Sequence, residues 1–87
     1  MQLARFLNNI FRKSGFILVD AYSKEYIIGN PPRDKPIKLR ILNKNLHYKL
    51  LFHPDLYFGE GYTDGQIIIE NGSLTDFLDL ALMNIGR

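Results

Sequence analysis

The residues of this chain that could take part in chemistry are few and widely spaced. His47 and His53 lie six positions apart, which places the two imidazoles on different sides of any helix and matches no common zinc pattern. Asp55, Glu60 and Asp64 offer carboxylates, but a calcium loop needs closer oxygen ligands around a glycine that this segment lacks. The sequence therefore predicts no metal site, and it favours surface or helix-capping roles for these acids.

Nucleophilic chemistry has as little support. The chain has no cysteine, which excludes disulfides, thiolate zinc sites and cysteine nucleophiles and fits a reducing compartment such as the cytoplasm. Ser14, Ser23 and Ser73 have no histidine and acid in a recognisable arrangement for catalysis. No catalytic residue is predicted, and the chain alone is not expected to be an enzyme.

Length and charge narrow the range of partners. The 87 residues, 46% of them hydrophobic, fit one small domain covering residues 1–87. Residues 1–49 contain ten Lys and Arg residues and three acidic residues, whereas residues 50–87 contain one Arg and six acidic residues. A basic half suggests an anionic phospholipid surface, nucleic acid or the acidic surface of another domain. The alternative is that folding mixes these charges into an ordinary solvated surface.

Residues 2–13 have the period of an amphipathic helix. Their apolar positions form one stripe of Leu3, Phe6, Leu7, Ile10 and Phe11. Gly15 is expected to end this helix in the left-handed conformation. Arg5, Arg12 and Lys13 are the candidates for contact with a lipid surface, because a basic residue near anionic headgroups contributes about 1 kcal/mol. The alternative is that the apolar stripe only docks the helix on a sheet.

The remaining pattern predicts an α+β fold with a small, mostly antiparallel sheet and flanking helices. Residues 16–22 and 26–28 read as a hairpin, and three prolines make residues 29–36 a loop. Strands are also expected at 37–41, with one buried and one basic face, and at 66–70. One helix follows Asn43 or Asn45 and stops at Pro54, and Asp55 opens a short second helix.

Ser73 and Asp76 form an approximate capping box for a last helix that reaches about Ile85. At 3.6 residues per turn, Leu80 and Met83 fall away from its buried face and are candidates for contact with a partner. The buried face is expected to comprise Leu74, Phe77, Leu78, Ala81, Leu82 and Ile85.

A nucleic-acid interface would have to use the cations of residues 38–49. Lys38, Arg40, Lys44 and Lys49 surround Tyr48 there, but no zinc finger, stacking motif or recognition helix accompanies them. No nucleic acid is expected as a partner.

Residues 59–65 contain three glycines, which favour close packing of the second helix on the sheet. A phosphate-cradling loop is not expected, because such loops follow a strand and open a helix, and here the order is reversed. Glu60 lies between two glycines of this segment, so we expect it to need an ion pair, a helix-end contact or a partner domain.

From Gly15 onward, the order of elements and one motif resemble the N-terminal domain of bacterial cyclopropane-fatty-acyl-phospholipid synthases. The motif is matched at Gly59, Glu60, Tyr62, Asp64 and Gly65. The chain departs from the family pattern at three places, namely Gly61, Thr63 and the pair Gln66-Ile67.

The resemblance implies a sterol-carrier-like module without catalytic, cofactor-binding or metal residues. In this family, methylene transfer from S-adenosylmethionine to phospholipid acyl chains takes place in a C-terminal methyltransferase domain, which would be the partner of this chain. The matched motif residues, with Leu80 and Met83, are then structural or interdomain candidates. A peripheral position at the inner face of the membrane is implied, and the oligomeric state stays open. The alternative is a freestanding lipid-surface or lipid-carrier module.

Overall fold

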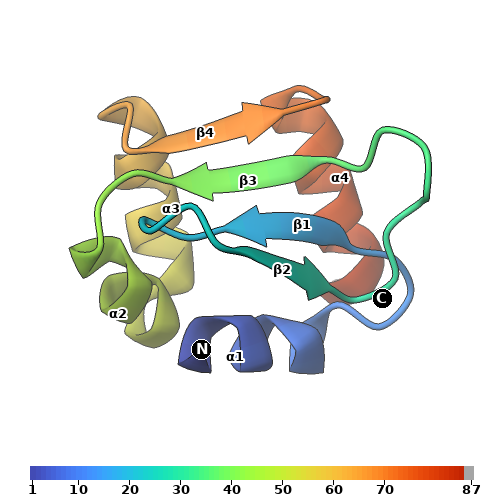
Figure 1. The fold of residues 1–87 in the computed structure, drawn as a ribbon, viewed down its shortest axis with the longest axis horizontal. Helices are drawn as coiled ribbons and strands as arrows, with labels where there is room; N and C mark the ends of the chain where they lie inside the picture. Colours follow the sequence, from blue (N-terminus) through green and yellow to red (C-terminus); the bar gives the residue numbers. More distant parts are fainter. Residues whose placement is uncertain (86–87) are drawn as a thin grey trace.

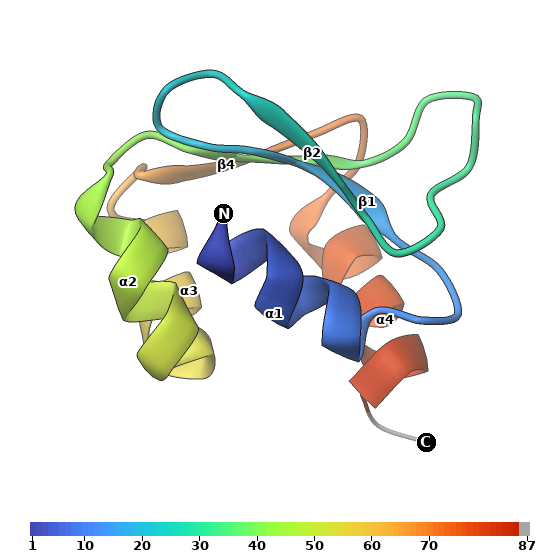
Figure 2. The same ribbon diagram turned by 60° about the horizontal axis from the view of Figure 1, so that its bottom comes forward.

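The computed structural model describes residues 1–85, in which four short strands form one sheet and four helices lie against one face of it (Figures 1 and 2). The predicted α+β class is confirmed. The strands are β1 (Phe16–Val19), β2 (Glu25–Ile28), β3 (Lys38–Ile41) and β4 (Ile67–Glu70), and the helices are α1 (Gln2–Ile10), α2 (Asn45–Phe52), α3 (Pro54–Thr63) and α4 (Leu74–Ile85).

The sheet has the order β2-β1-β3-β4. The β1–β2 and β3–β4 pairs are antiparallel, as the prediction of a mostly antiparallel sheet requires, and the central β1–β3 pair is parallel. Since β2 returns the chain to the start of β1, the proline-containing loop of residues 29–36 starts β3 in the direction of β1 (Figure 1). The two central strands therefore both run toward the end of the sheet where α2 begins.

The two faces of the sheet differ in chemistry, as the alternation along β3 predicts. Leu39 is buried beneath the helices. On the open face, the Lys38 ammonium lies 3.1 Å from the carboxylate of Glu25, and the Arg40 guanidinium lies 3.2 Å from that of Glu70. Both cations of β3 thus pair with acids of other strands, Arg40 with Glu70 of the neighbouring β4 and Lys38 with Glu25 of β2 on the far side of β1. The charge separation along the sequence is therefore partly mixed in the fold.

The first helix is shorter than predicted. It ends at Ile10, and Phe11 is extended with φ −89° and ψ 92°, which turns its ring into the core. The expected left-handed conformation is not found at Gly15 but at Gly29, whose φ is +67°. Gly15 is needed for a different reason, because the backbone of Ile28 and Gly29 lies against it and leaves no room for a Cβ atom.

The capping box of α4 is confirmed, but the buried face of this helix is partly wrong. The Ser73 amide donates to Asp76 Oδ2 at 2.9 Å, and the Asp76 amide donates to Ser73 Oγ at 3.1 Å. Phe77 is buried, whereas Leu78 and Leu82 are 43% and 64% exposed. Ile85 was also predicted to be buried, but its side chain is outside the part of the chain that the structure describes.

The exposure of Leu78 and Leu82 follows from a polar contact that fixes the rotation of α4 about its axis. Asn84 Oδ1 accepts a hydrogen bond of 2.7 Å from the Lys13 amide, and Asn84 Nδ2 donates to Ser14 Oγ at 3.0 Å. Since Leu80 lies one turn before Asn84, this rotation leaves Leu80 half-buried against the core and moves Leu82 into solvent.

Candidate functional site

Aromatic rings join α3, α4 and β1 at the centre of the helical layer. The centroid of Phe16 lies 5.0 Å from that of Phe11 and 5.1 Å from that of Phe77, both edge to face. Phe58 of α3 stacks on Phe77 at 5.3 Å. These contacts fix α4 on the sheet at one side of α3 and leave a space between α3, α4 and α1.

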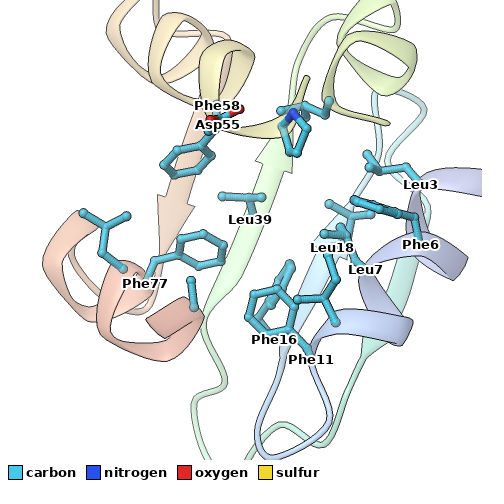
Figure 3. Close-up of a pocket in the computed structure, with 15 residues that line it drawn as sticks. Leu3, Phe6, Leu7, Phe11, Phe16, Leu18, Leu39, Asp55, Phe58 and Phe77 are labelled. Carbon is cyan, nitrogen blue, oxygen red and sulfur yellow. The ribbon is translucent and has the colours of Figure 1, made fainter. Parts of the chain in front are cut away.

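That space is a cavity of about 360 Å³, called the hollow below. Figure 3 shows Phe58 and Phe77 on one side of it and Leu3, Phe6 and Leu7 of α1 on the other, with the sheet between them. The floor includes Leu18 and Leu39, and the mouth includes the start of α3 and the outer side of α4. The lining residues are Leu3, Phe6, Leu7, Ile10, Phe11, Phe16, Leu18, Leu39, Leu50, Pro54, Asp55, Phe58, Phe77, Leu78 and Ala81.

The lining decides which ligands the hollow fits. All of its residues are apolar except Asp55, whose carboxylate lies at the start of α3 (Figure 3). Such a lining can exclude water and bury hydrocarbon, which is favourable at about 25 cal/mol per Å². S-adenosylmethionine does not fit, because its charged and hydrogen-bonding groups would lose water without gaining polar partners. No step of methylene transfer is therefore assigned to residues of the hollow.

Exposed apolar side chains occur on the elements that border the hollow, as they also do on the open sheet face at Ile27 and Ile68. Phe52 and Leu56, on either side of the lining residues Pro54 and Asp55, are 71% and 53% exposed. On α4, Leu78 lines the hollow, and the side chain of Leu82 one turn later is exposed. Met83 is 55% exposed, so of the two predicted contact residues of α4 it is the one with the more accessible side chain.

The glycines of the motif have different environments. Gly61 is buried on α3, and a Cβ atom there would lie 2.7 Å from Ile67 Cδ1 and 3.3 Å from Leu46 Cδ1. Gly59 faces open space, whereas Gly65 has φ +75° and ends the turn after α3. Close packing is thus provided by Gly61, the position at which the chain departs from the family pattern.

The polar residues of the motif lie at the outer side of the same helix. The side chains of Glu60, Tyr62 and Asp64 are all exposed. Burial does not force the Glu60 carboxylate to pair, because the side chain is exposed, and the expected contact with a partner domain stays a prediction. The carbonyl of Glu60 accepts a hydrogen bond of 2.9 Å from the Asp64 amide, so this segment closes the end of α3 through its backbone.

The three cations predicted to meet lipid are accessible. Arg5 is exposed on α1, and Arg12 and Lys13 are exposed in the segment that follows this helix. Arg12 Nε donates to the Asn9 carbonyl at 3.1 Å, and the Lys13 amide is held by Asn84. The helix is also tied to the sheet edge, because Asn8 Oδ1 accepts a hydrogen bond of 2.7 Å from the Gly29 amide. These contacts hold the basic segment at a fixed place beside the helical layer.

A polar junction between α2 and the β1–β2 turn was not predicted. The buried carboxylate of Asp20 accepts hydrogen bonds of 2.9 Å from the amides of Tyr22 and Lys24, which is why β1 stops at Val19 rather than reaching residue 22. His47 Nε2 accepts a hydrogen bond of 3.1 Å from the Ala21 amide. Burial lowers the pKa of His47, and the charge of Asp20 opposes that shift. Asp20 and His47 are too far apart in the sequence for their spacing to predict this junction.

Metal-ligating side chains are dispersed in residues 1–85: no three or more His, Asp and Glu residues come together as a group that could hold a metal ion. In the same part of the chain, no helix combines the length and apolar composition needed to cross a membrane. Comparison of the chain with protein-family models, curated proteins and solved structures found no match.

Proposed function

We propose that this chain is a non-catalytic, lipid-facing accessory domain of the kind found at the N-terminus of cyclopropane-fatty-acyl-phospholipid synthases. The single observation that carries the proposal is the apolar hollow, bordered by exposed apolar side chains of α3 and α4. A polar small molecule would be poorly matched to the lining of the hollow, whereas lipid acyl chains match it directly.

The role in this proposal is to bring a catalytic methyltransferase domain to membrane phospholipid. S-adenosylmethionine would be bound by that other domain, which transfers a methylene unit from it to unsaturated acyl chains. Support for this part comes from the motif at Gly59, Glu60, Tyr62, Asp64 and Gly65. The exposed side of α3 that bears Tyr62 and the exposed Met83 of α4 are then the surfaces available for docking the catalytic domain.

Anionic phospholipid is the favoured surface. Arg5, Arg12 and Lys13 are exposed beside the helical layer, and basic residues near anionic headgroups contribute about 1 kcal/mol each. Together with the apolar border of the hollow, these cations give the chain both of the attractions that peripheral proteins use, hydrocarbon burial and headgroup charge.

Vesicle co-sedimentation tests the proposal with matched charge variants. Replacing Arg5, Arg12 and Lys13 by glutamine is expected to weaken partitioning into phosphatidylglycerol vesicles by about 100-fold, from about 1 kcal/mol per charge. The control replaces Lys24, Arg33 and Lys35, exposed cations of the β1–β2 turn and the loop of residues 29–36, and changes net charge equally. A much smaller loss is expected for the control. Equal losses, or no binding of the unaltered chain, would contradict the proposal.

The second candidate is a freestanding lipid carrier, which the hollow also favours. A carrier must remove single lipids from a membrane, whereas an accessory domain need only contact them. Transfer of labelled phospholipid between donor and acceptor vesicles by the 87-residue chain alone distinguishes the two. Catalysed transfer would favour the carrier, and vesicle binding without transfer would favour the accessory domain.

A further inference from the structure

We infer that the hollow is a binding site for a single phospholipid acyl chain, about a dozen carbons of which are buried between α1, α3 and α4. The inference deepens the proposed function, on whose lipid-facing role it rests, by naming the ligand and its place in the fold. It concerns one chain held inside the domain, rather than attraction of the domain to a membrane surface.

The size of the hollow selects this occupant. A cavity of about 150 Å³ lined by Leu, Ile and Phe holds the six carbons of benzene, so about 360 Å³ holds about 12 to 14 carbons.

The chemistry of the floor points to the same conclusion. The floor is formed by the apolar side chains of Phe16, Leu18 and Leu39, which their neighbours cover almost completely. A ligand that reaches these residues must be narrow and must carry no polar group at its inner end, because the floor offers it no hydrogen-bond partner. The methyl end of an acyl chain meets both conditions.

The charge at the mouth distinguishes between sources of the chain. Among the described residues that line the hollow, Asp55 is the one with a charge, and its Oδ1 accepts a hydrogen bond of 3.0 Å from the Leu56 amide, which holds the carboxylate at the start of α3. A free fatty acid would place its own carboxylate near this group and be repelled. In an esterified chain this carboxyl group is an uncharged ester, which avoids the repulsion, so the inferred ligand is a phospholipid chain and not a free fatty acid.

Isothermal titration with n-alkylphosphocholines, kept below their critical micelle concentrations, tests the site without a membrane. Affinity is expected to rise about fourfold for each methylene up to about 12 to 14 carbons and then to level off. Dodecanoate is expected to bind about tenfold more weakly than dodecylphosphocholine, and Asp55→Asn is expected to remove most of that difference. Affinity that is independent of chain length, or that rises steadily beyond 14 carbons, would overturn the inference.

Two neighbouring substitutions on α4 form the structural control. Ala81 lines the hollow, so Ala81→Phe fills it and is expected to weaken dodecylphosphocholine binding at least 30-fold; Leu82 lies outside the lining, so Leu82→Phe is expected to change it less than twofold. Should Ala81→Phe lose its helical circular dichroism, Leu7→Trp narrows the hollow from α1 and is expected to weaken binding about tenfold. Equal effects at positions 81 and 82 would overturn the site, as would self-association that Ala81→Phe abolishes, because the occupant would then be a second copy of the chain.

These results are separable from those of the proposed function. Vesicle binding that depends on Arg5, Arg12 and Lys13, together with a flat response to alkyl-chain length, would sustain the accessory domain and reject the acyl-chain site. Saturable binding of monomeric alkylphosphocholine with no vesicle binding would do the reverse.

Discussion

The helical layer meets the sheet in two different ways. Where α2 and α3 pack on β4, called the α2 side below, the contact is filled, because Gly61 lies so close to Ile67 and Leu46 that a methyl group does not fit. Nearby, His47 and Asp20 accept hydrogen bonds from the β1–β2 turn, and a second, smaller cavity of about 190 Å³ lies between α1 and α2. On the α1 and α4 side, a cavity of about 360 Å³ lies over the same sheet.

This difference separates a structural part of the domain from one suited to binding. In a chain of 87 residues, a void costs stability because the side chains around it lose packing contacts. The α2 side supplies the close packing and satisfied polar groups that a small domain needs. The α1 and α4 side has its apolar lining partly unfilled, and that part of the molecule can gain most from a ligand.

The largest expected effect compares the two sides by truncation. Leu46→Ala on α2 is expected to lower the free energy of unfolding by about 3 kcal/mol, because Leu46 is buried in the filled contact. Leu7→Ala on α1 is expected to cost about 1 kcal/mol, because Leu7 is half-buried and already borders the hollow. Urea unfolding followed by far-UV circular dichroism measures both. Equal losses would erase the distinction between the two sides.

The next effect concerns the polar junction. Asp20→Ala is expected to cost about 1 to 3 kcal/mol, because the amides of Tyr22 and Lys24 lose the carboxylate oxygen that accepts their hydrogen bonds. Asp20→Asn keeps one oxygen and is expected to lose less. The same urea titration compares the two variants, and an Asn variant as unstable as the Ala variant would argue against these bonds as the source of stability.

Adding one methyl group to α3 sharpens the comparison. Gly61→Ala is expected to destabilise by about 1 to 3 kcal/mol, because the new Cβ overlaps Ile67 and presses on Leu46. Gly59→Ala, on the open side of the same helix, is expected to stabilise by up to about 1 kcal/mol through its higher helix propensity. Thermal unfolding of the pair measures the two shifts. A Gly61→Ala variant at least as stable as the parent chain would mean that the α2 side is not filled.

The smallest expected effect is a pH dependence at the junction. Burial holds the pKa of His47 below its ordinary value of 6.5, so the unfolded chain binds more protons than the folded one as the pH falls through that value. The His47 contribution to stability is therefore complete above pH 6.5 and is lost progressively below it. Urea midpoints on both sides of this pH, compared with those of His47→Gln, isolate the effect. A dependence that persists unchanged in His47→Gln would have to come from other groups.

The local elements of this fold were largely predictable, and their packing was not. The alternation of apolar and basic residues predicted the two faces of β3, and Pro54 predicted the boundary between α2 and α3. The spacing of Ser73 and Asp76 predicted the start of α4. These signals act within a few residues of one another. The rotation of α4 depends instead on Asn84, which contacts a segment about 70 residues earlier, and the period of apolar residues does not contain that information.

The candidate site was predictable only in part. Leu3, Phe6 and Leu7 were identified as the apolar face of an amphipathic helix, but that pattern does not distinguish a face that packs fully from one that borders a cavity. Phe58 stacks on Phe77 and joins α3 to α4, and the hollow lies between this pair and α1. Only the assembled fold contains this arrangement.

The most direct test of the account is to observe where hydrocarbon meets the domain. With leucine and isoleucine methyl groups labelled with carbon-13, a nuclear magnetic resonance titration with monomeric dodecylphosphocholine reports each surface separately. If an acyl chain binds in the hollow, the methyl chemical shifts of Leu7, Leu18 and Leu39 will change saturably. Those of Ile27 and Ile68 on the open sheet face will stay unchanged. Shifts confined to Ile27 and Ile68, or no saturable shift at the hollow, would contradict the account.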